Sequence, residues 1–95
     1  MNLTYIGHSA FLLEADGKSV MIDPYVTGNP VATGTQGDYS PQTILLTHAH
    51  NDHVGDTVEI ARRTDAKVIA TAELANYLGT QGVKNATGAN HGGTV

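Results

Sequence analysis

Cysteine is absent from this sequence of 95 residues, which excludes disulfide bonds and thiolate metal ligands. The absence also fits a reducing compartment, so we expect a cytoplasmic location. Lysine and arginine together number only five, and the formal net charge is −4. Nucleic-acid binding depends on clustered cations, so we expect no nucleic-acid partner.

Long apolar runs are missing as well. No run approaches the roughly 18 apolar residues of a membrane span. Met1 leads directly into a strand pattern, without the basic and apolar regions of a signal peptide. We therefore expect no membrane association. A chain this short forms at most one domain, and it buries only about two-thirds of its unfolded surface.

What is present begins with two predicted β-hairpins. Residues 3–6 alternate in polarity, and residues 10–15 read as the returning strand. Asp16-Gly17 is a favoured hairpin turn, and it leads into a third strand over residues 18–23, whose apolar centre suggests burial on both faces. Pro24 ends this strand because proline cannot continue a helix or a central strand.

Strands and helices alternate in the rest of the chain. Residues 43–46 and 67–71 are apolar runs typical of buried strands. Residues 56–64 begin with an acidic residue and end in Arg62-Arg63, which favours a short helix packed on the sheet. The two arginines are then a feature of the helix C-terminus and not a phosphate site.

The last part of the chain predicts one more helix. Residues 72–78 form it, with Thr71 as its cap and Gly79 as its stop. Residues 82–95 are expected to form a glycine-rich tail without a closing element. The alternation of strands and helices indicates the α/β class.

Three histidines and one aspartate gather within six positions, directly after the predicted strand at residues 43–46. Imidazole nitrogen and carboxylate oxygen bind borderline divalent ions without a thiolate, so we expect zinc, with manganese or iron as alternatives. Residues two apart in an extended chain point the same way, so the first two histidines can share one ion. The aspartate and the last histidine lie on a turning segment and can face a second ion. The candidate ligands are His48, His50, Asp52 and His53.

A solvated polar loop is the alternative interpretation, and it would suffice for a lone histidine. It does not explain four potential ligands between a strand and a helix. Two neighbouring ions can clamp the attacking and leaving oxygens of a hydrolysis, and the pKa of metal-bound water falls to about 7. If only one ion is bound, Asp52 would be placed as a general base. The cluster therefore predicts a metal-dependent hydrolase.

The segment His48-Ala49-His50-Asn51-Asp52-His53 resembles the H-x-H-x-D-H signature of the metallo-β-lactamase superfamily, and Val54-Gly55-Asp56 continues it. The opening Leu3 to Phe11, together with Ile22-Asp23-Pro24, is similar to bacterial metal-dependent hydrolases related to ascorbate-6-phosphate lactonase. The resemblance covers the whole chain. It implies a four-layer αβ/βα sandwich, a two-metal site at the sheet edges, and an ester, lactone or similar bond as the target in a small-molecule substrate.

The same resemblance implies that residues 1–95 are the N-terminal half of such a domain. The family's remaining ligands, a third histidine, a bridging aspartate and a further histidine, come from the other half. His91 is the only other histidine after His53, and it lies in a sequence similar to the turn before that half. We expect a second polypeptide carrying the C-terminal half, or a self-dimer, to supply the missing layer and ligands. A non-catalytic metal-binding fragment is the alternative function.

Two further residues are candidates near the metal. Asp23 ends a buried strand, which suits either a surface turn or a carboxylate that orients a metal-bound histidine. The resemblance favours the second role, because it places the family's first-motif aspartate at Asp23. His8 lies in a Gly-His-Ser turn, where it is either simply exposed or, by similarity to the lactonase-like branch, part of the site lining.

Residues 25–41 form a long, turn-rich loop in this interpretation. Loops longer than about 12–15 residues in a compact domain are usually functional or disordered. The loop could therefore wall a substrate pocket with Tyr25 or Tyr39. A plain surface excursion is the alternative.

Overall fold

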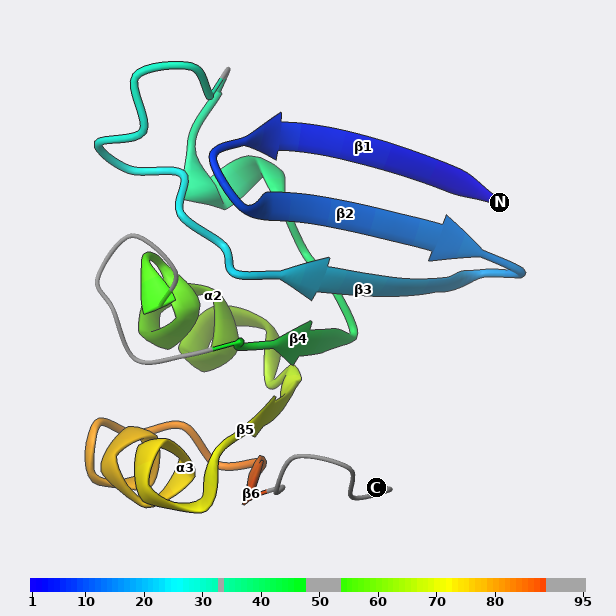
Figure 1. Cartoon of the computed structure of the whole chain (residues 1–95). Helices are drawn as coiled ribbons and strands as arrows, with labels where there is room; N and C mark the ends of the chain where they lie inside the picture. Colours follow the sequence, from blue (N-terminus) through cyan, green and yellow to red (C-terminus); the bar gives the residue numbers. More distant parts are fainter. Residues whose placement is uncertain (33, 48–53, 89–95) are drawn as a thin grey trace.

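In the part of the chain that the structure describes, residues 1–32, 34–47 and 54–88, six strands form one mixed sheet. The structure is a computed structural model, in which the strands lie side by side in chain order (Figure 1). The first three strands are antiparallel, and β3 to β6 are parallel. The strands are β1 (Asn2–Gly7), β2 (Ala10–Ala15), β3 (Lys18–Ile22), β4 (Thr43–Leu45), β5 (Lys67–Ala70) and β6 (Ala86–Gly88).

Two tight turns build the antiparallel part of the sheet. Asp16 and Gly17, between β2 and β3, have φ angles of 52° and 76°, as a two-residue hairpin turn requires. Gly7 ends β1 with a φ of 137°, and a Cβ at this position would collide with the Val31 side chain. The predicted pair of hairpins is therefore confirmed.

Helices connect the parallel strands. α2 (Thr57–Thr64) lies between β4 and β5, and α3 (Ala72–Thr80) lies between β5 and β6. Thr71 caps α3 as predicted, because its hydroxyl accepts the N–H of Leu74 at 3.4 Å. These elements confirm the predicted α/β class. Within the described residues, no helix has the length and apolar character that crossing a membrane requires.

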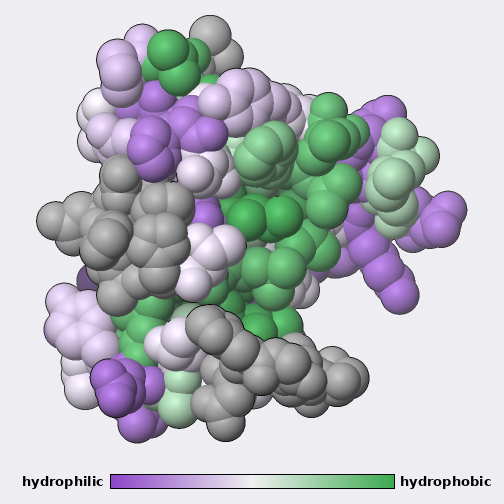
Figure 2. Space-filling view, in the orientation of Figure 1, coloured by the Kyte–Doolittle hydropathy of each residue, from purple (hydrophilic) through white to green (hydrophobic). Residues whose placement is uncertain are grey.

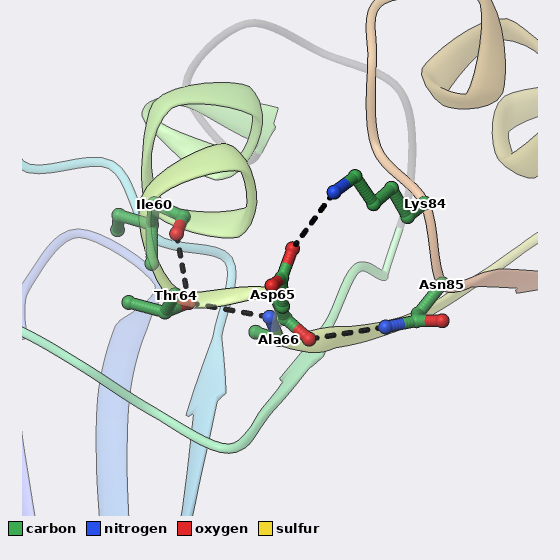
Figure 3. Close-up of polar contacts among 6 residues, drawn as sticks. All are labelled: Ile60, Thr64, Asp65, Ala66, Lys84 and Asn85. Carbon is green, nitrogen blue, oxygen red and sulfur yellow. Dashed lines mark hydrogen bonds and ion pairs between the residues drawn. The ribbon is translucent and has the colours of Figure 1, made fainter.

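The C-terminal end of α2 is joined by polar contacts to the residues before β6 (Figure 3). Asp65 adopts a left-handed conformation with a φ of 56°. The Asn85 side-chain amide donates to the Asp65 carbonyl at 3.1 Å, and the Lys84 ammonium lies 3.9 Å from the Asp65 carboxylate. The Thr64 hydroxyl donates to the carbonyl of Ile60 at 2.8 Å. These contacts end the helix and turn the chain into β5.

Two expectations about the C-terminal part are wrong. α3 continues past Gly79, because Leu78 is fully buried and keeps this turn against the core. Residues Ala86–Gly88 form β6 beside β5, where the sequence predicts an open tail. A Cβ at Gly88 would lie 2.7 Å from the Cα of Ala72, so this glycine permits close packing against α3.

α2 and α3 cover one face of the sheet. The side chains in the middle of this face are fully buried, namely Met21, Ile44 and Val68. They belong to one core with Ile60 of α2 and Leu78 of α3. The row of paired residues that crosses the strands on this face is Leu12, Met21, Ile44, Val68 and Ala86.

The opposite face is also apolar but only partly buried. Tyr5 is 61% exposed, and Leu3 in the neighbouring row is 62% exposed. Figure 2 shows hydrophobic residues gathered over the strand region of the molecule. The row of paired residues on this face is Tyr5, Phe11, Ile22, Leu45 and Ile69.

Candidate metal centre

The predicted metal ligands belong to residues 48–53, which connect β4 to α2 in the sequence. We call residues 48–53 the ligand segment. It lies outside the described residues, but its two flanks, Thr47 and Val54, are described. The predicted ligands within the segment are His48, His50, Asp52 and His53.

Asp23 holds the residue that precedes the ligand segment. It is 1% exposed and directly follows β3. Its Oδ1 accepts the backbone N–H of Thr47 at 2.8 Å, and its Oδ2 accepts the Thr47 hydroxyl at 2.6 Å. Its own N–H donates to the carbonyl of Leu45 at 2.9 Å. Asp23 is therefore not an exposed turn residue, although its predicted action on a metal-bound histidine stays a prediction.

Asp56 holds the other flank of the ligand segment. It is 6% exposed, and its Oδ2 accepts the N–H groups of Val26 at 3.0 Å and Thr27 at 2.7 Å. Its backbone N–H donates to the carbonyl of Pro24 at 2.9 Å. From the sequence, Asp56 is expected to begin a helix and to continue the family-like signature, and neither pattern predicts its contacts with Val26 and Thr27. The one local signal is the glycine before it.

Gly55 allows this close approach of the two backbones. Its φ is 48°, and a Cβ there would lie 2.5 Å from the carbonyl oxygen of Pro24 and 2.6 Å from the Cα of Tyr25. The carbonyl of Val54 accepts the hydroxyl of Thr57 at 2.5 Å. The chain thus leaves the ligand segment along a path on which a larger residue than glycine does not fit.

His8 is exposed in the turn after β1 and has a φ of 55°. The Tyr5 hydroxyl donates to the His8 carbonyl at 2.8 Å. The His8 ring meets the Tyr25 ring edge-on, with the centroids 5.9 Å apart. Because Tyr25 is two residues from Asp23, the structure places His8 beside the chain segment that holds the flanks of the ligand segment.

The two tyrosines of the long loop lie in different places. Tyr25 is at the edge with Asp23, whereas Tyr39 lines a hollow with Leu12 and Ser19. Ser19 is near the start of β3, and the start and end of a five-residue strand are more than about 10 Å apart. Of the two candidates for a pocket wall, only Tyr25 is therefore at the edge of the ligand segment.

The donor set of the ligand segment fits a divalent metal. Three imidazoles and one carboxylate suit zinc, manganese or iron. Among the residues that the structure describes, no three histidine, aspartate or glutamate side chains form a metal site. The carboxylates of Asp23 and Asp56 accept bonds from backbone N–H groups of Thr47 and of residues 26–27, so both are engaged with the flanks of the ligand segment. The metal prediction rests on residues 48–53.

A hollow of about 620 Å³ lies beside the exit of the ligand segment, between α2 and α3. Its size falls within the range of small-molecule pockets. Val54 and Gly55 line it next to the ligand segment, and Glu59, Glu73 and Tyr77 line it from the helices. Two exposed glutamates give this hollow an acidic rim.

A mixed sheet with helices on one face, whose fourth strand is followed in the sequence by three histidines and an aspartate within six positions, defines an α/β domain with a candidate metal site. Residues 3–93 match the metallo-beta-lactamase superfamily. The chain belongs to this superfamily, and its fold is the N-terminal part of the metallo-β-lactamase fold, as predicted.

Relatives of known name support this assignment. The chain is 53% identical over 85 residues to a UPF0173 metal-dependent hydrolase of Shouchella clausii, a match that covers 90% of this chain and 37% of that protein. It is 46% identical to Igni18, a metallo hydrolase of the archaeon Ignicoccus hospitalis, with a TM-score of 0.82, over 93% of this chain and 39% of Igni18. The chain thus spans about two-fifths of the length of these relatives.

A more distant structure shares the fold alone. CmlA, a diiron β-hydroxylase of Streptomyces venezuelae, is 22% identical, with a TM-score of 0.73, over 92% of this chain and 20% of CmlA. The same arrangement of strands and helices therefore occurs in proteins with different reactions, and the reaction has to be argued from the site.

Proposed function

We propose that this chain is the metal-binding half of a metal-dependent hydrolase, in which His48 and His50 hold one ion and Asp52 and His53 hold a second. The observation that carries the proposal is that two buried aspartates hold both flanks of the ligand segment at the edge where the parallel strands end. The names of the relatives at 53% and 46% identity support hydrolysis.

Zinc is the proposed native metal, with manganese and iron as the alternatives. When bound, a divalent metal lowers the pKa of water to about 7 and supplies a hydroxide nucleophile at neutral pH. The histidines of this chain bind through neutral imidazole nitrogen. If only one ion is bound, Asp52 accepts the proton of the attacking water as a general base. The proposed target is an ester, lactone or similar bond, and this choice rests on the family resemblance.

The proposed substrate is a small molecule and not a nucleic acid. The hollow beside the ligand segment has the size of a small-molecule pocket, and the rim carries Glu59 and Glu73. With only five Lys and Arg residues in the chain, a phosphate backbone would meet mainly negative charge. We also propose a cytoplasmic location, which the cysteine-free sequence supports.

The test of the function measures metal content first and hydrolysis second. The chain is loaded separately with zinc, manganese or ferrous iron, dialysed and analysed for metal per chain. Hydrolysis of a panel of esters and lactones is then measured with the completing polypeptide present. We expect bound metal and metal-dependent turnover. Equal turnover after chelation would contradict the proposal.

A non-catalytic metal-binding fragment is the second candidate. It is favoured by one observation, namely that residues 48–53 offer the first proposed ion two histidines. A catalytic zinc usually has three protein ligands and a water, whereas the first ion has only two histidines here. This candidate predicts weak metal binding without turnover, even when a completing polypeptide is bound.

We further propose that the partly buried sheet face is covered by a polypeptide equivalent to the remaining part of the relatives. The row that contains Phe11, Ile22, Leu45 and Ile69 crosses five strands, and a continuous apolar surface of this kind favours contact with another layer. Relatives that are more than twice as long contain enough chain for such a layer. The same polypeptide would bring the further metal ligands.

Size-exclusion chromatography with light scattering, followed by mass spectrometry of the peak, tests this partner. We expect a complex with a second polypeptide that carries histidine and aspartate ligands. A self-dimer would show that a second copy covers the face instead. A folded monomer that binds two ions by itself would contradict both forms of the proposal.

A further inference from the structure

Asp56 stands immediately before α2, where an aspartate usually accepts an N–H of the first helical turn. The Asp56 side chain makes no such capping bond. Its Oδ2 instead accepts the N–H groups of Val26 and Thr27, residues 30 and 29 positions earlier in the chain. The Asp56 carboxylate therefore does not serve the start of its own helix.

The segment that Asp56 contacts also holds the other flank of the ligand segment. Asp23 accepts two hydrogen bonds from Thr47, and the carbonyl of Pro24 accepts the backbone N–H of Asp56. Residues 23–27 are thus bonded to both flanks of residues 48–53. Because one short stretch binds both flanks, it sets the position of each flank relative to the other.

The bond from Val26 to Asp56 is buried, and the bond from Thr27 is partly buried. Asp56 is 6% exposed and Val26 is 3% exposed. A buried carboxylate is costly unless its oxygens are hydrogen-bonded, and bonds from N–H groups to an ionised acceptor are stronger than neutral ones. Gly55 adds a steric restriction, because a Cβ there would lie 2.5 Å from the Pro24 carbonyl oxygen. The exit of the ligand segment is therefore held by polar bonds and by close packing.

We propose that Asp56 is a positioning residue for the metal ligands. It holds the C-terminal end of the ligand segment against residues 23–27, as Asp23 holds the N-terminal end. In this proposal, the two contacts fix the distance between the ends of the segment His48 to His53. The inference rests on the proposed function, because it takes these residues as the ligands. It goes beyond that function by giving a role to a residue outside the proposed ligand set.

The experiment measures metal affinity and fold stability separately. Asp56→Asn keeps the shape of the side chain, Asp56→Ala removes it, and Gly55→Ala pushes the exit away while the carboxylate remains. Zinc dissociation constants are measured by chelator competition, well below the melting temperature of each variant, and cobalt-loaded samples are compared by visible absorption. We expect a loss of zinc affinity of about 10- to 100-fold and a changed cobalt spectrum in Asp56→Ala and Gly55→Ala. The loss in Asp56→Asn should be smaller, because the amide oxygen can still accept the same two N–H groups.

Two matched controls separate positioning from general destabilisation. Asp65→Asn is the same substitution at the opposite end of α2, where the side chain is exposed, and we expect unchanged affinity. Ile60→Val trims a buried side chain of α2 and should lower the melting temperature with wild-type affinity. Wild-type affinity and cobalt spectrum in the Asp56→Asn and Asp56→Ala variants would overturn the inference. If Asp56→Ala does not fold, Asp56→Asn and Gly55→Ala decide together, and wild-type affinity in both would overturn the inference.

The failure of the proposed function gives a different result. In that case, the wild-type chain either binds no metal or binds it equally well after His48→Ala substitution. If the wild-type chain binds metal through His48 and only the Asp56 variants are unaffected, the positioning role alone is wrong.

Discussion

At the scale of single residues, the first metal ion depends on the two histidines that are two positions apart. We predict that His48→Ala and His50→Ala each abolish tight binding of that ion, because either substitution leaves one imidazole from this pair. Equilibrium dialysis with metal analysis measures the loss. His91→Ala removes an imidazole to which no role is assigned, and it serves as the control. An unchanged metal content in either of the first two variants would refute the ligand assignment.

In our proposal, Asp52 binds a metal ion or acts as a general base, and its side chain does not stabilise the fold by packing. Asp52→Asn should therefore reduce turnover about 100-fold or more, while the thermal stability of the metal-free chain changes little. The comparison requires a melting curve and a rate on the same preparation. Asn51→Ala, a change at the neighbouring position, is the control and should keep the rate. Comparable losses of stability and turnover in Asp52→Asn would indicate a structural aspartate.

At the scale of elements, the C-terminal end of α2 holds the long loop between β3 and β4. The Arg63 guanidinium donates to the Ser40 hydroxyl at 3.0 Å, to the Gln36 carbonyl at 2.9 Å and to the Tyr39 carbonyl. Gln36 begins η1 (Gln36–Asp38), a short 3-10 helix in this loop. Arg63 is thus the C-terminal basic residue that the sequence predicts, and it binds carbonyl groups of another element.

Removal of this guanidinium should loosen the loop. We predict that Arg63→Ala lowers the free energy of unfolding by about 1 kcal/mol, since the lost bonds are made by a charged group but are exposed to water. Arg63→Lys should recover little, because an ammonium lacks the planar fork of the guanidinium. Chemical denaturation gives the stability, and limited proteolysis reports on residues 34–41. Arg62→Ala is the control. Equal losses in both alanine variants would show that the effect belongs to charge at the helix end.

At the scale of the whole molecule, the two faces of the sheet differ in what covers them. Val68 and Ile69 are neighbours in β5, yet Val68 is fully buried under the helices and Ile69 is on the partly buried face. A lysine at each position therefore tests the two faces with the same new side chain. A comparison of the two lysine variants separates an effect on the stability of the chain from an effect on its association with the covering polypeptide.

We predict that Val68→Lys destabilises the fold by about 4 kcal/mol or more, because it buries an unpaired charge in the core. Ile69→Lys should leave the chain folded but prevent its complex with the covering polypeptide. Circular dichroism melting and light scattering measure the two effects. A folded Ile69→Lys variant that still forms the complex would place the covering layer elsewhere.

Much of the fold could be predicted from local patterns. The Asp16-Gly17 turn, the alternation of strands and helices, and the Thr71 cap depend on residues within a few positions of each other, and the structure confirms them. The cluster of potential metal ligands at residues 48–53 can likewise be recognised within a few positions of the sequence. The sequence by itself therefore determined the class of the domain, and it located the stretch on which the metal proposal rests.

Only the tertiary structure decided which distant residues meet. The carboxylate of Asp56 accepts the N–H of Val26, which lies 30 residues earlier in the chain. A sequence pattern that favours a helix start does not predict that contact. The same holds for the strand at Ala86–Gly88, which forms because β5 offers an open edge and a glycine packs against α3. These features depend on the order of strands in the sheet, which brings the ends of β3 and β4 together, and no local propensity specifies that order.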